Sequence, residues 1–513
     1  MKTRTVATLL LVLILMITYV PLIAADDLPT LTVMMHDNGR TWDPNTSNNV
    51  KIQEVIGAKL DVAVVKEDVI TLSFASGDLA DVMELPYLTF AEYINTGYIL
   101  PIDELLTEHG QEILNLTTPF AKELCTVDGV MYGYPYENNN AKYLTYMRKD
   151  WLDNLGFDLT QYEQLPDSDI YNIPLDDYVK MMEAFTFNDP DGNGVNDTFG
   201  LSTYTESNEA VMFMAFYGAF GGVLQQYYEK DGLAWAYETT DDYRDALKCL
   251  NDLWNKGVID PEIFILGKDQ AKSNLMNGKS GSFVGWWSTA YELVRDGMRD
   301  LQPTVEWISA EIIGPDGKVG MKDNGRITNV TCITTSCKDP EFAMQVLNKL
   351  NEESVWWMIR YGIEGEHYTR DKDGYPARTE IGQKLFEGMT LDTLYNLTNC
   401  IDIENFANSA PQTDYNLSLR RSMFVHQFVK DIPLYTNLFY GLPQTQESMD
   451  FGVDVASTVK TANMQFITGE VELNDQTWAD YIKKWQSMGG SEILASYVDA
   501  YNALNNTSIK PAL

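Results

Sequence analysis

Short apolar runs alternate with amphipathic segments along the first third of the chain. The runs at 31–35, 60–65 and 81–85 are rich in Val, Leu and Met, which predicts short buried strands. Helices are predicted between them at 49–58 and 70–75. Strands that are separated by helices form βαβ units, so this pattern predicts a mostly parallel sheet in an α/β fold.

A second alternating block begins near Tyr143. Its predicted strands cover 143–147, 278–287 and 326–335, and its predicted helices cover 149–155, 176–185, 241–255, 289–299 and 339–351. Beyond Gln465 the pattern predicts helices at 475–488 and 491–504, which a Gly489-Gly490 break separates. No low-complexity linker divides the two blocks, so we expect two lobes that are joined by ordered crossings.

Length and charge narrow the class of protein. A chain of 513 residues is too long for one core and suits two or three domains. The net charge is −37, although 45% of the residues are hydrophobic, which is typical of a folded acidic protein. Such a surface repels nucleic acid and anionic lipid, so neither is expected as a partner. We also expect the protein to be a monomer.

Residues 1–25 predict a secretory signal peptide. Lys2 and Arg4 form a basic start, an apolar run covers 9–20, and small residues lead to Ala25. The apolar run is short for a membrane span, which makes a retained anchor the weaker alternative. No lipobox cysteine follows this segment. We therefore expect an exported protein, either at the cell surface or in the periplasm.

Cysteine and histidine spacing indicates neither a disulfide framework nor a zinc site. The five cysteines are sparse and irregular, and the four histidines are scattered. Cys332 and Cys337 are near enough in sequence to pair, but buried free thiols are equally consistent with the pattern.

Residues 189–197 carry oxygen-bearing side chains at alternate positions and predict a calcium loop. Asp189, Asp191, Asn193 and Asp197 supply side-chain oxygens, and Val195 can supply its carbonyl. This spacing matches the first half of an EF-hand loop and suits a hard cation that takes six to eight oxygens. Gly200 stands where an EF-hand has its bidentate Glu, so a sensor EF-hand is not expected. A solvated turn that binds nothing is the alternative.

Several motifs occur in one order along nearly the whole chain. They are ASGDLADVM at 75–83, DGVMYGYP at 128–135, YMRKDWLDNLG at 146–156, DPDGNGVNDTFG at 189–200 and YGIEGEHY at 361–368. Together they resemble the extracellular solute-binding proteins of bacterial ABC importers, in the branch that takes up oligosaccharides. Ala80 departs from the family pattern, which usually has Pro there.

The resemblance implies a periplasmic-binding-protein-like type II fold, in which two α/β lobes and a hinge enclose an interlobe ligand cleft. Lobe 1 is expected to comprise 26–140 plus 327–400, and lobe 2 to comprise 141–326 plus 401–513 with the calcium loop 189–197. The implied function is capture of an oligosaccharide and its delivery to the permease subunits of an ABC importer, with calcium in a structural role and no catalysis.

A sugar cleft needs flat aromatic faces for the C–H faces of the rings and fixed polar groups for the hydroxyls. Trp42 and Asp78 are candidates because ligands in open α/β sheets bind beyond the carboxyl ends of strands. Trp286 and Trp287 point to opposite sides of one segment, so one can face the cleft while the other packs in the core. In each case a core or loop position is the alternative.

Four further candidates lie near the predicted hinge or in a family motif. Tyr136 and Asn138 precede the second block, and Tyr361 and Glu364 belong to the 361–368 motif. The sequence does not identify the sugar. An anionic ligand is disfavoured by the acidic surface unless the cleft is lined by Arg40, Arg148, Arg326 or Arg360.

Two other functions are compatible with a secreted chain of this composition. A glycoside hydrolase needs two carboxylates about 5–10 Å apart, and 74 acidic residues can neither reveal nor exclude such a pair. A surface carbohydrate-binding adhesin is the second. Sugar binding without turnover separates the transport function from hydrolysis.

Overall fold

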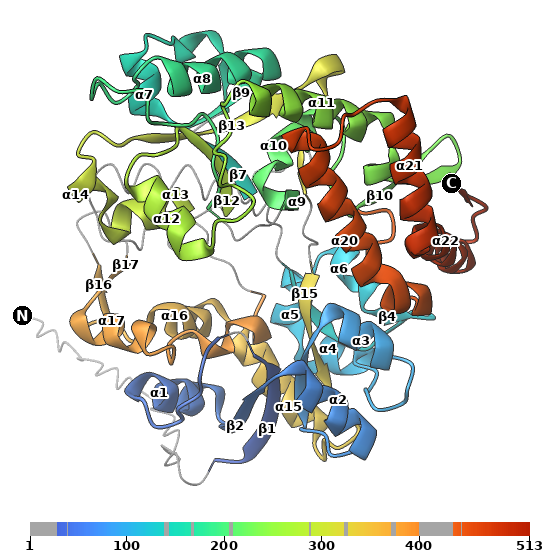
Figure 1. Ribbon diagram of the computed structural model, residues 1–513. Coiled ribbons are helices and arrows are strands. Elements are labelled where there is room, and N and C mark those ends of the chain that lie inside the picture. The colour runs from blue at the N-terminus through green and yellow to red at the C-terminus, as the bar shows by residue number, and fades with distance from the viewer. Residues whose placement is uncertain are drawn as a thin grey trace, which may run out of the picture.

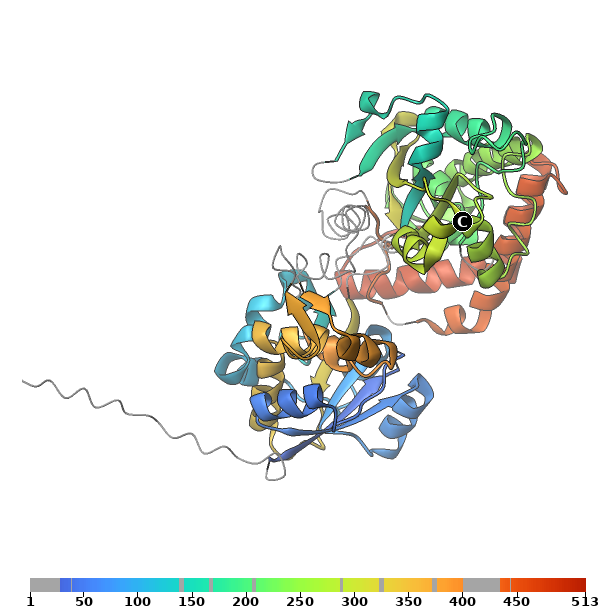
Figure 2. The same ribbon diagram turned by 90° about the vertical axis from the view of Figure 1, so that its left-hand side faces the viewer.

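The structure is a computed structural model, and it describes residues 28–37, 39–137, 143–165, 169–204, 209–286, 289–322, 327–370, 376–399, 434–442 and 444–513. No helix within these residues is long and apolar enough to cross a membrane. The described residues form two lobes, which lie one above the other in Figure 1 and are seen from the side in Figure 2.

The first lobe is built on a five-stranded sheet with the order β2-β1-β3-β15-β6. Its strands are β1 Thr30–His36, β2 Lys59–Val65, β3 Val82–Pro86, β6 Tyr134–Glu137 and β15 Ile327–Ile333. β1 pairs in parallel with β2 and β3, whereas β15 is antiparallel to both β3 and β6. The predicted βαβ units are confirmed, with α1 at Ser47–Ile56 and α2 at Glu67–Ser76.

The second lobe contains another five-stranded sheet, with the order β12-β7-β13-β9-β8. Its strands are β7 Tyr143–Arg148, β8 Glu163–Gln164, β9 Ile170–Pro174, β12 Ser282–Trp286 and β13 Trp307–Ile313. Only β13 and β9 are parallel neighbours here. In the first sheet, for which a mostly parallel arrangement was expected, two of the four neighbouring pairs are parallel and two are antiparallel. Hydrophobic periodicity locates strands, but it carries no signal for the direction in which distant strands pair.

The remaining helices surround these sheets. In the first lobe they are α3 Tyr87–Tyr93, α4 Asp103–His109, α5 Gln111–Leu116, α6 Pro119–Leu124, α15 Pro340–Leu350, α16 Glu353–Tyr361 and α17 Glu380–Glu387. In the second they include α7 Lys149–Asn154, α8 Leu175–Phe187, α10 Met214–Ala219, α11 Asp241–Asn255, α12 Lys268–Met276 and α13 Thr289–Leu293.

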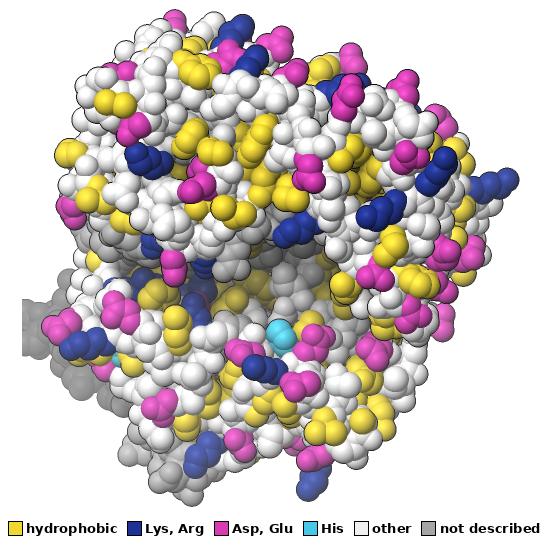
Figure 3. All heavy atoms as spheres, viewed as in Figure 1, with side chains coloured by type: hydrophobic (Ala, Val, Ile, Leu, Met, Phe, Trp, Pro, Cys, Tyr) yellow, Lys and Arg dark blue, Asp and Glu magenta, His cyan; other side chains and the backbone are white. Residues whose placement is uncertain are grey.

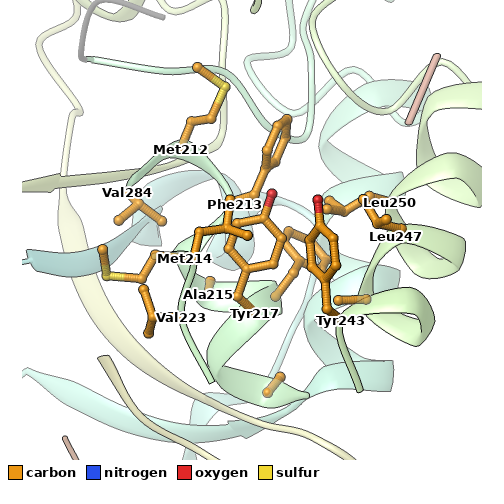
Figure 4. Close-up of a cluster of buried hydrophobic side chains, with 14 of the residues drawn as sticks. Met212, Phe213, Met214, Ala215, Tyr217, Val223, Tyr243, Leu247, Leu250 and Val284 are labelled. Atoms are coloured by element: carbon orange, nitrogen blue, oxygen red, sulfur yellow. The ribbon is translucent and has the colours of Figure 1, made fainter. Parts of the chain in front are cut away.

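The C-terminal helices pack on the second lobe. Figure 4 shows the core that they complete, with Tyr217 and Tyr243 directed the same way from α10 and α11. Both hydroxyls donate to the side-chain oxygen of Asn463, at 2.8 and 3.0 Å. Asn463 lies on α20 (Gln446–Thr468), and α21 (Asp475–Trp485) and α22 (Ser491–Asn505) follow it. The C-terminal segment, although distant in sequence from α10 and α11, thereby becomes part of this core.

The strand registers define which edges of the two sheets face each other. In the first sheet β6 ends and β15 begins at the edge where β1 and β3 have their carboxyl ends. In the second sheet β7 begins, and β12 and β13 end, at one common edge. The chain crosses between the lobes from β6 to β7 and again before β15, so these two edges face one another across the interlobe space.

A third connection between the lobes includes residues 434–442. Tyr440 lies beside the ring of Tyr87, and its hydroxyl exchanges hydrogen bonds with the backbone of Ile327 at 3.0 and 3.1 Å. On the other side the backbone N–H of Leu438 donates to the carbonyl of Tyr227. This segment therefore holds one side of the hinge to both lobes.

The described cysteines are free thiols, namely Cys125, Cys249, Cys332 and Cys337. Cys332 is buried in the first sheet, where its thiol faces the carbonyl of Met83. The alternative of a local Cys332–Cys337 disulfide is not realised.

Candidate functional site

An ion-pair cluster lies at the facing edge of the first lobe. Nη1 of Arg360, at the end of α16, donates to both carboxylate oxygens of Asp392 at 2.6 Å. Arg40, in the loop after β1, reaches the same carboxylate at 3.5 Å. Asp392 has a φ of 73°, a left-handed conformation that Asp adopts more readily than most residues. Such conformations persist where the surrounding structure enforces them, often at binding sites.

Aromatic rings surround this cluster. The guanidinium of Arg360 lies over the ring of Tyr395, 5.4 Å from its centroid. Tyr136 meets the same ring edge-on at 5.5 Å. Arg40 and Arg378 both lie over Phe386, at 5.2 and 3.9 Å. Although burial favours the neutral form of Arg360, the groups around it, chiefly the Asp392 carboxylate, together raise its pKa.

The loop that carries Arg40 and Trp42 is tied to the segment that carries Asp392. The backbone N–H of Thr41 donates to the carbonyl of Met389, and the hydroxyl of Thr393 donates to the carbonyl of Thr41. Trp42 packs on the first-lobe core, and no described residue accepts a hydrogen bond from its buried indole N–H. These backbone contacts hold Trp42 beside the ion-pair cluster.

Glu84 is a buried acid in the middle of the first sheet. It accepts from the backbone N–H of His36 at 2.8 Å, from the side chain of Asn329 and from that of Asn396 at 3.1 Å. Burial raises its pKa to about 7, even though these hydrogen bonds favour the charged form. Glu84 therefore fixes the end of β1 and the Thr393–Leu397 turn relative to each other.

The facing edge of the second lobe is aromatic. Trp286 ends β12 with 37% of its surface exposed, and Tyr143 at the start of β7 meets it edge-on at 5.4 Å. On the strand next to β7, Glu311 of β13 is 2% exposed, and neither of its carboxylate oxygens has a hydrogen-bond partner among the described residues. Burial raises the pKa of Glu311 to about 8, which favours the protonated, neutral form of this acid.

Figure 3 shows a hollow between the two lobes, and both basic and hydrophobic side chains are visible within it. The facing edges described above carry side chains of both kinds. Flat rings and fixed polar groups on opposing walls are the features that a sugar site requires.

The structure brings together only part of the predicted site. Trp42, Tyr136 and Trp286 lie at the facing edges. Asp78 follows α2 and precedes β3, at the opposite edge of the first sheet, because that helix returns the chain to the start of the next strand. Asn138 and Trp287 lie outside the described residues.

The structure does not place either candidate from the 361–368 motif in the wall of a ligand site. Tyr361 is 1% exposed, with its ring packed against Trp356 and Tyr368. Glu364 is exposed and pairs with Arg370 at 3.3 Å. The glycines of this motif serve a tight turn, since a side chain at Gly362 would collide with His367.

The sequence did not single out four residues of this region, namely Asp392, Tyr395, Arg378 and Phe386. It gave Arg40 and Arg360 only as candidates in case the ligand is anionic. Arg40 and Asp392 are 352 residues apart, and no local pattern links them. Arg148, another of the conditional arginines, is instead buried in an ion pair with Asp150 of α7.

The acidic loop 189–197 wraps around Asn193. The backbone N–H of Asn193 donates to Asp189 at 3.0 Å and to Asp191 at 3.3 Å, and its side-chain amide donates to Asp197 at 3.2 Å. Burial and the nearby Asp189 raise the pKa of Asp191, while a hydrogen bond from Lys279 lowers the pKa of Asp197.

The loop has the right donor chemistry for calcium, but its carboxylates are not gathered around one point. Among the described residues, no group of three or more His, Cys, Asp or Glu is close enough to hold a metal. Asp189 and Asp191 lie close together, and a bound cation would reduce the repulsion between their carboxylates. The loop follows α8, which returns from the facing edge, so it lies at the far end of the second lobe.

The model of the bacterial extracellular solute-binding protein family matches residues 48–354. The chain belongs to this family. It is a solute-binding protein rather than an enzyme, and the family is an exported one.

Similar proteins extend this finding over nearly the whole chain. The polygalacturonan/rhamnogalacturonan-binding protein YtcQ of Bacillus subtilis is 25% identical over 464 residues, which cover 88% of this chain and 87% of YtcQ. A solved structure of Streptococcus pneumoniae FusA, an EF-hand mutant in complex with fructo-nystose, has 19% identity and a TM-score of 0.62 and covers 93% of this chain and 99% of FusA.

A solute-binding protein from Bifidobacterium longum infantis, described as binding HMO, has 17% identity and a TM-score of 0.69 and covers the same shares of the two chains. These likenesses show the fold. The predicted type II periplasmic-binding-protein-like fold with two α/β lobes is thereby confirmed.

Proposed function

We propose that this protein captures an oligosaccharide between its two lobes and delivers it to the membrane subunits of an ABC importer. The observation that carries the proposal is the pair of facing edges, one with fixed ionic groups among tyrosine rings and the other with Trp286 and Tyr143. Three relatives whose names or descriptions include polygalacturonan, a fructo-oligosaccharide or HMO support a sugar as the ligand.

The proposed mechanism is closure about the hinge. Sugar rings stack on Trp42 or Tyr136 in the first lobe and on Trp286 in the second, and polar groups of the edges bind the hydroxyls. Closing then removes both walls from water and presents the closed surface to the permease. In this proposal the lobes have the limits 26–140 plus 327–400 and 141–326 plus 401–513.

A ligand screen tests this proposal. Purified protein is mixed with neutral and acidic oligosaccharides, and thermal stability, compaction in small-angle scattering and released reducing ends are measured. A ligand should raise the melting temperature in a concentration-dependent way and compact the protein without being cleaved. Cleavage would support the hydrolase alternative, and binding without compaction would count against closure.

Calcium is proposed as a structural ion of the second lobe. Asp189, Asp191, Asn193 and Asp197 would hold it with the carbonyl of Val195, once Lys279 releases Asp197. When bound, the ion would neutralise the carboxylates and stiffen the loop. The alternation of oxygen-bearing side chains in the loop supports this proposal. The loop lies away from the facing edges, so the proposal gives the ion no direct role in sugar binding.

Export is proposed to depend on residues 1–25 as a cleaved signal peptide, with the mature protein acting as a monomer at the cell surface or in the periplasm. Mass spectrometry of the exported protein would identify the mature N-terminus. An N-terminus before Ala25 would contradict the predicted cleavage.

A further inference from the structure

Glu311 is an acid of the second lobe that is buried without a hydrogen-bond partner. Neither of its carboxyl oxygens pairs with any residue that the structure describes, and the residue is almost fully covered. Most buried polar groups in folded proteins are paired, because an unpaired one lowers stability. Exceptions to this rule are expected at functional sites, so Glu311 calls for a functional explanation.

The position of Glu311 in β13 brings it close to the interlobe space. Side chains alternate along a strand, and Ile308 and Ala310 belong to the large core on one face of the sheet. Trp307 and Glu311 therefore share the other face, on which Trp307 packs in a smaller cluster. β13 ends at Ile313, so Glu311 lies toward the facing edge of this cluster.

A second unpaired polar group lies on the same face of the sheet. Thr289 is fully buried, and among the described residues its hydroxyl has no hydrogen-bond partner. It begins α13, which contributes Ala290 and Leu293 to the smaller cluster. Two unpaired groups thus occur on one largely apolar face, next to the edge where the sugar is proposed to bind.

The surroundings of Glu311 favour its neutral form. On its face of the sheet, the neighbouring Tyr146 donates its hydroxyl to the carbonyl of Trp286, and Glu163 accepts from Asn172, the register partner of Glu311. α7, α8 and α10 pack on the opposite face, with the large core. Burial raises the pKa of Glu311 to about 8. A neutral carboxyl group can donate one hydrogen bond and also accept.

We propose that Glu311 binds a vicinal diol of a sugar unit: its O–H donates to one hydroxyl oxygen, and its carbonyl oxygen accepts from the neighbouring hydroxyl. The inference rests on the proposed function and names a residue that selects the sugar. The carboxyl group is covered in the structure, so the sugar reaches it only after the side chains over it move aside. A deoxy sugar would leave the carboxyl group unpaired and should bind more weakly.

The test uses nystose, lacto-N-tetraose and trigalacturonate in titration calorimetry at pH 7, and the tightest binder is carried into the variants. Glu311→Gln keeps a donor and an acceptor, so its affinity should stay within about threefold of the wild type. Glu311→Leu keeps the approximate size but loses both groups, and should bind at least about tenfold more weakly. Melting temperatures check that both variants fold.

Ser309→Ala is the matched control, because Ser309 is a buried polar residue on the same face of β13 but farther from the facing edge. It should change the affinity less than about twofold, since no sugar contact is assigned to it. Similar losses in the Ser309→Ala and Glu311→Leu variants would overturn the inference, because they would show an effect of packing alone.

The pH dependence of binding separates the proposed role from a structural one. Loss of the proton removes the donor of Glu311, so the wild-type affinity should fall by about tenfold from pH 7 to pH 9. Glu311→Gln should not show this fall. Unchanged affinity in Glu311→Leu, or a wild-type affinity that rises with pH, would overturn the inference and leave the proposed function standing. Failure of every sugar to bind would overturn both.

Discussion

At the facing edge of the first lobe, charged groups are held in a network: Arg360 grips Asp392, and Glu84 accepts three hydrogen bonds. At the facing edge of the second lobe the Trp286 ring is exposed, and the nearby acid Glu311 has no hydrogen-bond partner within the part of the chain that the structure describes. A network fixes direction and charge, which suits selection of a ligand. An exposed aromatic ring can stack on many different sugars, which suits closure over any ligand that the first lobe has bound.

The two edges should also differ in how strongly a substitution changes the stability of the protein. Removing one member of a partly buried ion pair leaves an uncompensated charge, whereas replacing an unpartnered acid removes a cost. Substitutions at the two edges should therefore change stability and binding in different ways.

Arg360→Met should destabilise the protein by about 3 kcal/mol, because it leaves Asp392 buried without its main partner. The free energy of unfolding in urea measures this effect. Adding Asp392→Asn should recover part of the loss, since Asn tolerates the left-handed backbone and carries no charge. Arg244→Met, whose partner Asp475 is exposed, should cost less than about 1 kcal/mol. Equal losses in the two variants would show that the first-lobe edge is not a network.

Glu311→Gln should stabilise the protein by on the order of 2 kcal/mol at pH 8, and less at pH 5. The pKa of Glu311 is raised from 4.5 to about 8 in the fold, so the folded state binds the extra proton between these values. Its contribution to stability is therefore fully present below pH 4.5 and is lost as pH rises to about 8. Thermal melting from pH 5 to 9 measures the slope, which should flatten in the variant.

Glu84→Gln is the contrasting change. Glu84 also has a raised pKa, about 7, but its two oxygens accept from three donors. Glutamine has one acceptor oxygen, so at least one donor loses its partner and the variant should be destabilised by about 1–2 kcal/mol. Stabilisation by both substitutions would remove the distinction between a networked and an isolated acid.

Calcium at 1 mM should stabilise the wild-type protein by about 1.4 kcal/mol if the loop binds it with a dissociation constant near 0.1 mM, typical of weak extracellular sites. Asp189→Asn with Asp191→Asn should abolish this shift. Asp158→Asn, an exposed acid of the same lobe that accepts from Thr160, is the control. Sugar affinity should be the same with and without calcium, because the loop is remote from both edges. A calcium-dependent affinity would contradict the structural role.

Trp286→Ala should weaken sugar binding by about 1 kcal/mol, roughly fivefold, through loss of one stacking face. The comparison variant is Trp254→Ala, since Trp254 also contacts a neighbouring ring but lies on α11. Because the second-lobe edge supplies stacking rather than charge, the loss should be similar for acidic and neutral sugars. A loss confined to acidic sugars would assign selection to this edge as well.

Much of the fold could be predicted from the sequence, because strands and helices leave local periodic signals. The predicted strand at 60–65 is β2, and the helix predicted at 241–255 has the same bounds as α11. The direction of β7 and β12 could not be predicted, since their partners come from distant parts of the chain. Of the residues that the sequence predicted for ligand binding, Trp42, Tyr136 and Trp286 lie at the facing edges, and each is an aromatic residue next to a strand end.

The α/β class, the family motifs and the oxygen-rich loop 189–197 are evident from the sequence, because each depends on residues that are neighbours in the chain. The structure was needed to place Asp78 at the opposite edge, to show that Tyr361 is buried, and to bring Arg40, Arg360 and Asp392 together. These results depend on long-range packing, because the facing edge is formed where strand ends from separate segments converge. Which segments converge depends on sheet order and helix packing, and neither has a local signature.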